Sequence, residues 1–147
     1  RNHSYLWGEV LLSLALKQMD DAGSETGEAV FSAAAGLQKL SPSERVPAIC
    51  DAVIDIAAAL FNVSGRELRH PGRSSLSVSR VRQIAMYVTH VALGLSMREV
   101  GQGFGRDRTT VLHACHQIED MRDDQEFDGI VAMTERVMTA ALGRAGQ

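Results

Sequence analysis

Apolar residues recur at intervals of three and four along most of the chain, and no stretch alternates with the two-residue period of a strand. The clearest helix start is Ser41-Pro42-Ser43-Glu44, which combines an N-cap serine, a first-turn proline and a reciprocal glutamate. The inward positions that follow it are Val46, Ile49, Cys50, Val53, Ile54, Ala57 and Leu60. The pattern predicts an all-α fold.

The middle of the chain predicts three more helices with their own start and stop signals. Ser64 opens a single short turn of helix, which His70-Pro71-Gly72 ends. A long helix runs from Ser77 to about Gly94. Its inward positions are Val81, Ile84, Ala85, Val88, Ala92 and Leu95. The capping box Ser96–Glu99 then opens a short helix, and the glycines expected in the turn after it are Gly101, Gly103 and Gly105.

The two ends of the chain also have helical patterns. An apolar-rich helix is predicted over Tyr5–Met19. A weaker helix is predicted over Glu25–Leu40, where two glycines lower the helix propensity. After the polar residues Asp123–Glu126, a last amphipathic helix carries Ile130, Met133, Val137 and Ala141. We therefore expect a helical leader over residues 1–40 and a helical domain over residues 41–147.

The segment from Gly105 to Ile118 combines a polar start with a buried apolar face. Asp107 is a suitable N-cap, since its carboxylate can accept hydrogen bonds from the first backbone N–H groups of a helix. The positions predicted to face inward are Val111, Leu112, Cys115, Ile118 and Met121. The side chains left at the exposed start are Arg108, Thr109, Thr110 and His113. A helix that reads duplex DNA presents such residues to base edges, so the sequence predicts a helix-turn-helix.

The net charge of −3 is unevenly distributed. Residues 64–122 hold nine arginines, five carboxylates and four of the five histidines, for a net charge of +4. Residues 1–63 carry −4 and residues 123–147 carry −3. The positive charge coincides with the helix-turn-helix pattern, as contact with phosphates requires. The acidic flanks should weaken non-specific binding.

The segment Gly105–Cys115 reads Gly-Arg-Asp-Arg-Thr-Thr-Val-Leu-His-Ala-Cys and resembles a family signature, Gly-Arg-Asp-His-Thr-Thr-Val-Leu-His-Ala-Cys. That family is the C-terminal DNA-binding domain, domain IV, of the bacterial chromosomal replication initiator DnaA. The resemblance includes Ser77–Met86 and Phe61–Ser64, and in all covers Val46 to Arg122. It implies a Trp-repressor-like helix-turn-helix that binds double-stranded DNA at DnaA-box-like sites, in the bacterial cytoplasm at the nucleoid.

The resemblance also implies which residues lie near DNA. They are Arg73, Arg82, Gln83, His90, Arg106, Asp107, Arg108, Thr109, Thr110 and His113. Those from Arg106 onward are expected near the major groove, and the others at the backbone or a flanking groove. The family usually has histidine where Arg108 stands, and its turn is one residue longer, so sequence preference should differ. The family's minor-groove arginine aligns with Ser74, and the adjacent Arg73 could take its role with a shift of one position, so either Ser74 or Arg73 occupies the minor-groove position.

Other kinds of site are not supported by the sequence. Neither Lys17 nor Lys39 stands in a Walker loop, so we expect neither nucleotide binding nor an ATP-driven initiator. His113, Cys115 and His116 lack a second ligand cluster, and no catalytic set converges, so we expect no metal, cofactor or enzymatic activity. The two cysteines lie on apolar faces and are predicted to be buried thiols, which suits the cytoplasm.

Two hypotheses of function follow. The first is a stand-alone, initiator-related protein that binds DnaA-box-like sites and modulates replication initiation or transcription. The alternative is an interaction protein that engages the replication initiator or its regulators, with DNA binding weak or lost. Its supporting feature is the apolar set of the leader, Leu6, Trp7, Val10, Leu11 and Leu14. The same residues could simply pack on the domain. No membrane-spanning run occurs, and the first residue, Arg1, suggests that a short segment precedes it.

Overall fold

The computed structural model describes residue 37 and residues 40–143, so the leader predicted over residues 1–40 lies almost entirely outside the described residues. The helices described are α3 (Pro42–Phe61), α4 (Gly65–Arg69), α5 (Leu76–Val91), α6 (Met97–Phe104), α7 (Arg108–Met121) and α8 (Gln125–Leu142). All regular structure in this part of the chain is helical, which confirms the predicted all-α class. None of these helices is both long and apolar enough to cross a membrane.

Serine caps start the helices largely where the sequence predicts. The hydroxyl of Ser64 accepts a hydrogen bond from the Glu67 N–H at 3.4 Å. At α6 the capping box is reciprocal: Ser96 Oγ accepts from the Glu99 N–H at 3.1 Å, and the Glu99 carboxylate accepts from the Ser96 N–H at 2.9 Å. Helix α5 begins one residue earlier than expected, because Ser75 takes the N-cap position. Local capping chemistry therefore sets most of the helix starts.

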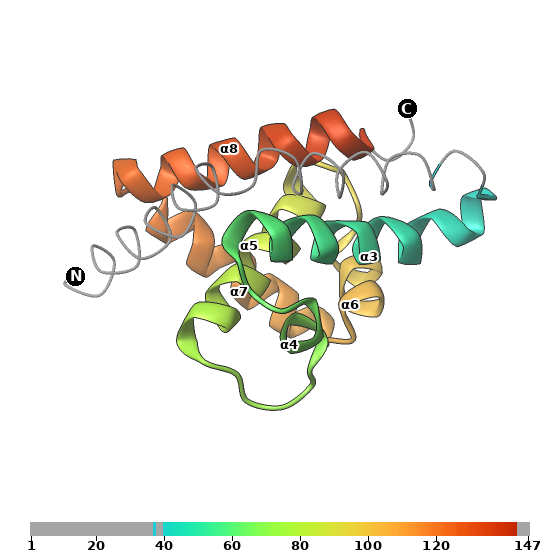
Figure 1. The fold of residues 1–147 in the computed structure, drawn as a ribbon, viewed down its shortest axis with the longest axis horizontal. Helices are drawn as coiled ribbons and strands as arrows, with labels where there is room; N and C mark the ends of the chain where they lie inside the picture. Colours follow the sequence, from blue (N-terminus) through green and yellow to red (C-terminus); the bar gives the residue numbers. More distant parts are fainter. Residues whose placement is uncertain (1–36, 38–39, 144–147) are drawn as a thin grey trace.

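Helix α5 lies at the centre of the domain. It packs most extensively against α7 and also contacts α3, α4, α6 and α8. Figure 1 shows α8 along one side of the molecule, with α4 and the loop that follows it on the opposite side. The predicted inward residues that are buried in α5 are Val81, Ile84, Ala85 and Val88. The core formed around this helix fixes the position of α7.

The turn between α6 and α7 is shorter than the sequence predicts, because Gly101 and Gly103 belong to α6. Both allow other parts of the protein to pack closely against the helix. A Cβ on Gly101 would lie 2.7 Å from the carbonyl oxygen of Arg106, and one on Gly103 would overlap Sγ of Cys50 and lie 2.6 Å from its Cβ. Gly105 alone is a turn glycine, with φ 66, a conformation that favours glycine.

A polar network joins the end of α7 to α5 and α8. Arg122 donates to Asp128 at 2.5 Å, to Glu135 at 2.7 Å and to the hydroxyl of Tyr87 at 3.1 Å. The Tyr87 hydroxyl in turn donates to Glu119 at 2.5 Å. Burial, followed by the hydrogen bond to Glu119, raises the pKa of Tyr87 to about 12. These contacts hold the C-terminal end of α7 in place.

Both cysteines lie in the core as free thiols, as the sequence predicts. Burial raises the pKa of Cys50 to about 12, and the charges of Asp51 and Glu99 add to the effect. Burial also raises the pKa of Cys115 to about 11, with a further contribution from Glu119. Near neutral pH, both thiols therefore stay protonated.

Gly103→Ala should destabilise the protein, because Gly103 lies where α6 packs against α3. The new methyl group would overlap the Cys50 side chain, so we expect the free energy of unfolding to fall by about 1–3 kcal/mol. The matched control is Gly129→Ala in α8, where a Cβ meets nothing within 4 Å and should add about 0.5–1 kcal/mol. Urea denaturation followed by circular dichroism measures both, and equal effects of the two substitutions would contradict this packing.

Candidate nucleic-acid interface

Helix α7 is divided lengthwise into a buried face and an exposed one. Its buried residues are Val111, Ala114, Cys115, Ile118 and Met121. Leu112, which the periodicity places inward, is only partly buried. The exposed residues of its first two turns are Arg108, Thr109, Thr110 and His113. None of these four side chains forms a hydrogen bond or ion pair with the part of the chain that the structure describes, so their polar groups are available to a partner.

Asp107 occupies the N-cap position of α7, as predicted, but its carboxylate does not cap the helix. The backbone is extended there, with φ −67 and ψ 150, and the Val111 N–H donates to the Asp107 carbonyl at 3.1 Å. The side chain makes no capping hydrogen bond, contrary to expectation. It is exposed, so water can hydrate it in place of the backbone. Both the carboxylate and the first N–H groups of α7 are therefore open to a ligand.

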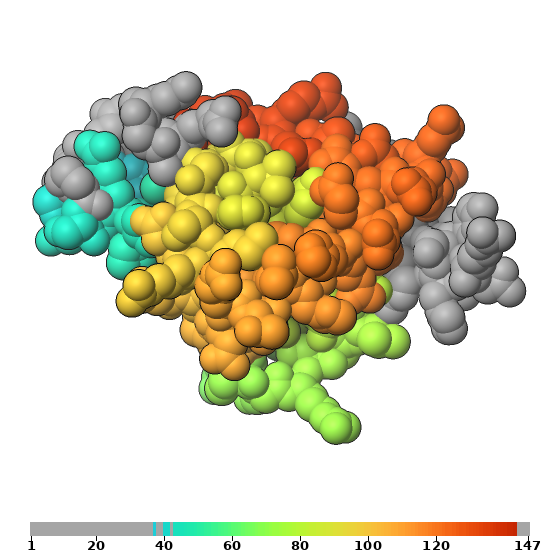
Figure 2. All heavy atoms as spheres, turned by 180° about the vertical axis from the view of Figure 1, so that it is seen from behind, coloured from blue at the N-terminus to red at the C-terminus, as the bar shows by residue number. Residues whose placement is uncertain are grey.

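A second exposed segment lies next to the start of α7. Residues 70–75, called here the loop 70–75, connect α4 to α5. Figure 2 shows α6 and α7, in yellow to orange, across one face of the molecule, with the green segment after α4 projecting from the edge of that face. Arg73 in this loop is exposed and, within the described residues, has no hydrogen-bond or ion-pair partner. Arg106 links the loop to α7, since its Nη2 donates to the carbonyl of His70 at 2.7 Å.

Arg82, predicted to contact DNA, is only 7% exposed, and its guanidinium group is turned into the protein. Its Nε donates to the carbonyl of Leu68 at 2.9 Å. Its Nη2 donates to the carbonyl of Glu67 and to Oγ of Ser74, each at 2.9 Å. Burial, together with the charge of Arg106, lowers its pKa from the ordinary arginine value. The sequence could not show these internal contacts, because the acceptors lie 8 to 15 residues away from Arg82.

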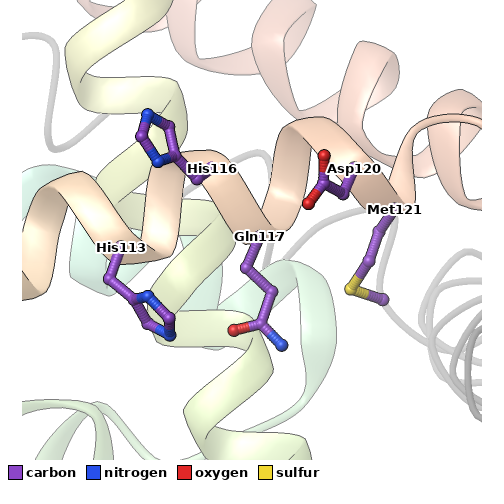
Figure 3. A pocket seen from close by; sticks show the side chains of 5 residues that line it. All are labelled: His113, His116, Gln117, Asp120 and Met121. Carbon is purple, nitrogen blue, oxygen red and sulfur yellow. The ribbon is translucent and has the colours of Figure 1, made fainter.

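Gln83 lies where α5 meets α7. Its Oε1 accepts from Nη1 of Arg80 at 2.7 Å, and its Nε2 lies 3.5 Å from Oε1 of Gln117. Figure 3 shows that Gln117 and His113 project from one side of α7, whereas His116 points to the other side. The structure therefore places Gln83 beside the exposed edge of α7 that His113 shares.

His90 is the predicted site residue that lies at the opposite end of α5 from the loop 70–75. It lies in the last turn of α5, about 21 Å along the helix from Leu76 at a rise of 1.5 Å per residue. Its Nδ1 is within hydrogen-bond distance, 2.7 Å, of the carbonyl of Leu95. The ring therefore serves the connection between α5 and α6 and lies far from the loop 70–75.

The arginines of this region divide into paired and exposed groups. Arg69 is paired with Asp55 at 3.1 Å and with Asp51 at 3.4 Å. The other arginines with hydrogen-bond partners inside the protein are Arg80, Arg82, Arg106 and Arg122. The exposed ones without such partners among the described residues are Arg66, Arg73, Arg98 and Arg108. Among the described residues, four of the nine arginines between positions 64 and 122 therefore have side chains without an internal partner.

One candidate that the sequence analysis missed is Arg66, at the start of α4. With His70, Arg73 and Ser74 it lines a hollow of about 300 Å³ beside the loop 70–75. The sequence does not single out Arg66, because the residues around an arginine in so short a helix are determined only by the fold. The hollow adds a second cation to the face that carries Arg73.

Comparison with known proteins agrees with this geometry. A family model described as the bacterial DnaA protein helix-turn-helix matches residues 50–118. The chromosomal replication initiator protein DnaA of Mycobacteroides abscessus is 36% identical over 87 residues, which cover 58% of this chain and 18% of the relative. The matched range includes the loop 70–75, α6 and most of α7. Residues 50–118 of this chain are therefore similar to the helix-turn-helix domain of bacterial DnaA.

Proposed function

We propose that this domain binds double-stranded DNA in a sequence-dependent manner, at DnaA-box-like sites, with the start of α7 in the major groove. The observation that carries the proposal is the first part of α7, where Arg108, Thr109, Thr110 and His113 are exposed and unpaired among the described residues. The opposite face of the same helix is buried against the domain. A recognition helix needs this combination, because only its N-terminal residues reach base edges.

Each of these side chains suits a particular base edge. Arg108 can donate two hydrogen bonds to O6 and N7 of guanine. Thr109 and Thr110 can contact a thymine methyl group or hydrogen-bond a base. Asp107, whose carboxylate does not cap the helix, can accept from the N4 amino group of cytosine. An arginine in place of the family's histidine offers a planar fork of donors, so we propose a base preference that differs from that of relatives.

Arg73 is proposed to enter the minor groove next to the site of α7. A narrow minor groove has a negative potential that attracts arginine. Arg73 is exposed, and its loop is tied to α7 through the hydrogen bond between Arg106 and His70. Contacts in two grooves would fix both the position and the direction of the domain on the duplex.

The cellular role is proposed from the relative, a chromosomal replication initiator protein. By occupying DnaA-box-like sites, the domain would modulate replication initiation or transcription. The 147 residues contain no Walker loop, and the proposed binding requires neither ATP nor any other cofactor.

Thr110→Ala tests the base contact. We expect the affinity for a duplex with a DnaA box to fall by about 1 kcal/mol, roughly fivefold, with little change for a scrambled duplex. Fluorescence anisotropy at one fixed salt concentration measures both affinities, and Thr139→Ala, exposed on α8, is the control. Equal losses on the two duplexes would exclude Thr110 as a base-reading residue. A wild-type protein that does not distinguish the duplexes would refute the proposed function itself.

Arg73→Ala tests the charge contact of the loop. We expect weaker binding to both duplexes, and a slope of log K against log salt that is smaller by about 0.9, since one fewer counterion is released. Arg136→Ala is the matched control, because Arg136 is exposed on α8, on the side of the molecule opposite the loop (Figure 1). A titration of affinity between low and moderate salt gives the slope, and an unchanged slope would contradict the contact.

A further inference from the structure

The short helix α4 ends in backbone carbonyls that two arginines from other elements bind. The last carbonyls of a helix have no partner within it, and in a helix of five residues this leaves most of them unsatisfied. Arg82 of α5 binds the carbonyls of Glu67 and Leu68, and Arg106 binds that of His70. Cations near a helix C-terminus are also favoured by the helix dipole. The start of the loop 70–75 is therefore held by charge-assisted hydrogen bonds.

Arg82 binds both ends of the same loop. Its guanidinium contacts the carbonyls of Glu67 and Leu68 before the loop and the hydroxyl of Ser74 near its end. A buried charge is unfavourable unless it has hydrogen-bond partners, and these three acceptors supply them. These contacts engage Nε and Nη2, and with 7% of its surface exposed the side chain is held in place by the loop and the end of α4.

Arg106 connects the loop to the recognition helix. Its backbone N–H donates to the carbonyl of Gly101 at 2.8 Å, which closes the turn between α6 and α7. Its Nη2 donates to the carbonyl of His70 at 2.7 Å. One residue therefore belongs to the turn just before α7 and also anchors the segment that carries Arg73.

The loop is also restrained from within. The Gly72 N–H donates to Nδ1 of His70 at 3.0 Å. A Cβ on Gly72 would lie 2.7 Å from Cε1 of the same ring, so the backbone passes close to the imidazole. Arg73 is the next residue, so it lies in a loop whose two ends are held by hydrogen bonds and whose backbone packs against the ring of His70.

We propose that Arg82 and Arg106 are positioning residues, which hold the loop 70–75 at a fixed place relative to α7 so that Arg73 and α7 engage one duplex together. The inference rests on the proposed DNA binding. A loop that is already ordered loses less conformational freedom on binding, and its contact is correspondingly stronger. The two arginines then act through Arg73 and make no phosphate contact of their own.

A double-mutant cycle on the full chain separates the two roles of Arg106. We expect Arg106→Ala alone to weaken binding to a DnaA-box duplex by about fivefold to tenfold, because the contact of Arg73 is lost. In an Arg73→Ala background the same substitution should change affinity less than about twofold, and the salt slope should not fall further. Losses that multiply, with a slope lower by about another 0.9, would show that Arg106 binds phosphate directly and would overturn the proposal.

A second measurement needs no DNA. Hydrogen exchange in the free protein should be faster at the amides of His70 and Gly72 in Arg106→Ala than in wild type, and unchanged in Arg136→Ala. Equal exchange in wild type and Arg106→Ala would overturn the anchoring. If wild-type protein binds no duplex while exchange still differs, the proposed function fails and the anchoring does not.

Arg82→Lys provides an independent test of Arg82. Lysine keeps the charge but lacks the planar fork that reaches carbonyls on one side and Ser74 on the other. We therefore expect a loss of affinity about as large as that of Arg106→Ala, measured beside a melting curve for each variant. Wild-type affinity with Arg82→Lys would show that charge alone suffices and would overturn the positioning role of Arg82.

Discussion

The burial of one face of α7 against α5 is the constraint on which the interface depends. Val111 and Ile118 have no exposed surface, and they fix the rotation of α7 about its own axis. Residues at neighbouring positions of the same turns are then directed to solvent, whatever their own preferences. The core around α5 therefore determines which side chains of α7 can meet a ligand.

The elements that the sequence predicts well are those set by local chemistry. Ser64 and Ser96 cap their helices through hydrogen bonds to residues three positions later, so a short window of sequence contains the whole signal. The same holds for the periodic apolar residues of α5 and α7. These parts of the fold, including the exposed start of α7, could be read before the structure was known.

The parts that could not be read depend on residues distant in sequence. Position 103 in α6 requires glycine because a Cβ there would overlap Cys50, which is 53 positions away. Arg69 forms ion pairs with Asp51 and Asp55 of α3. Arg82 donates a hydrogen bond to the carbonyl of Leu68 in α4. An arginine in a sequence indicates a positive charge. The direction in which its side chain points is decided by the hydrogen-bond acceptors that the fold places near it. Charge totals therefore locate the interface more reliably than they assign its individual contacts.

The exposed charges along α7 also differ between its two ends. Arg108 stands at the first position, with the positive end of the helix dipole, whereas Glu119 and Asp120 are exposed near the last turn. A polyanion is attracted to one end of this helix and repelled by the other, so the helix can approach DNA in one orientation only. A single copy of the domain has no twofold symmetry with which to read a palindrome. If the domain binds DNA as proposed, the sequence it reads has a direction, and reversing such a site would reverse the side on which α8 and the rest of the protein stand.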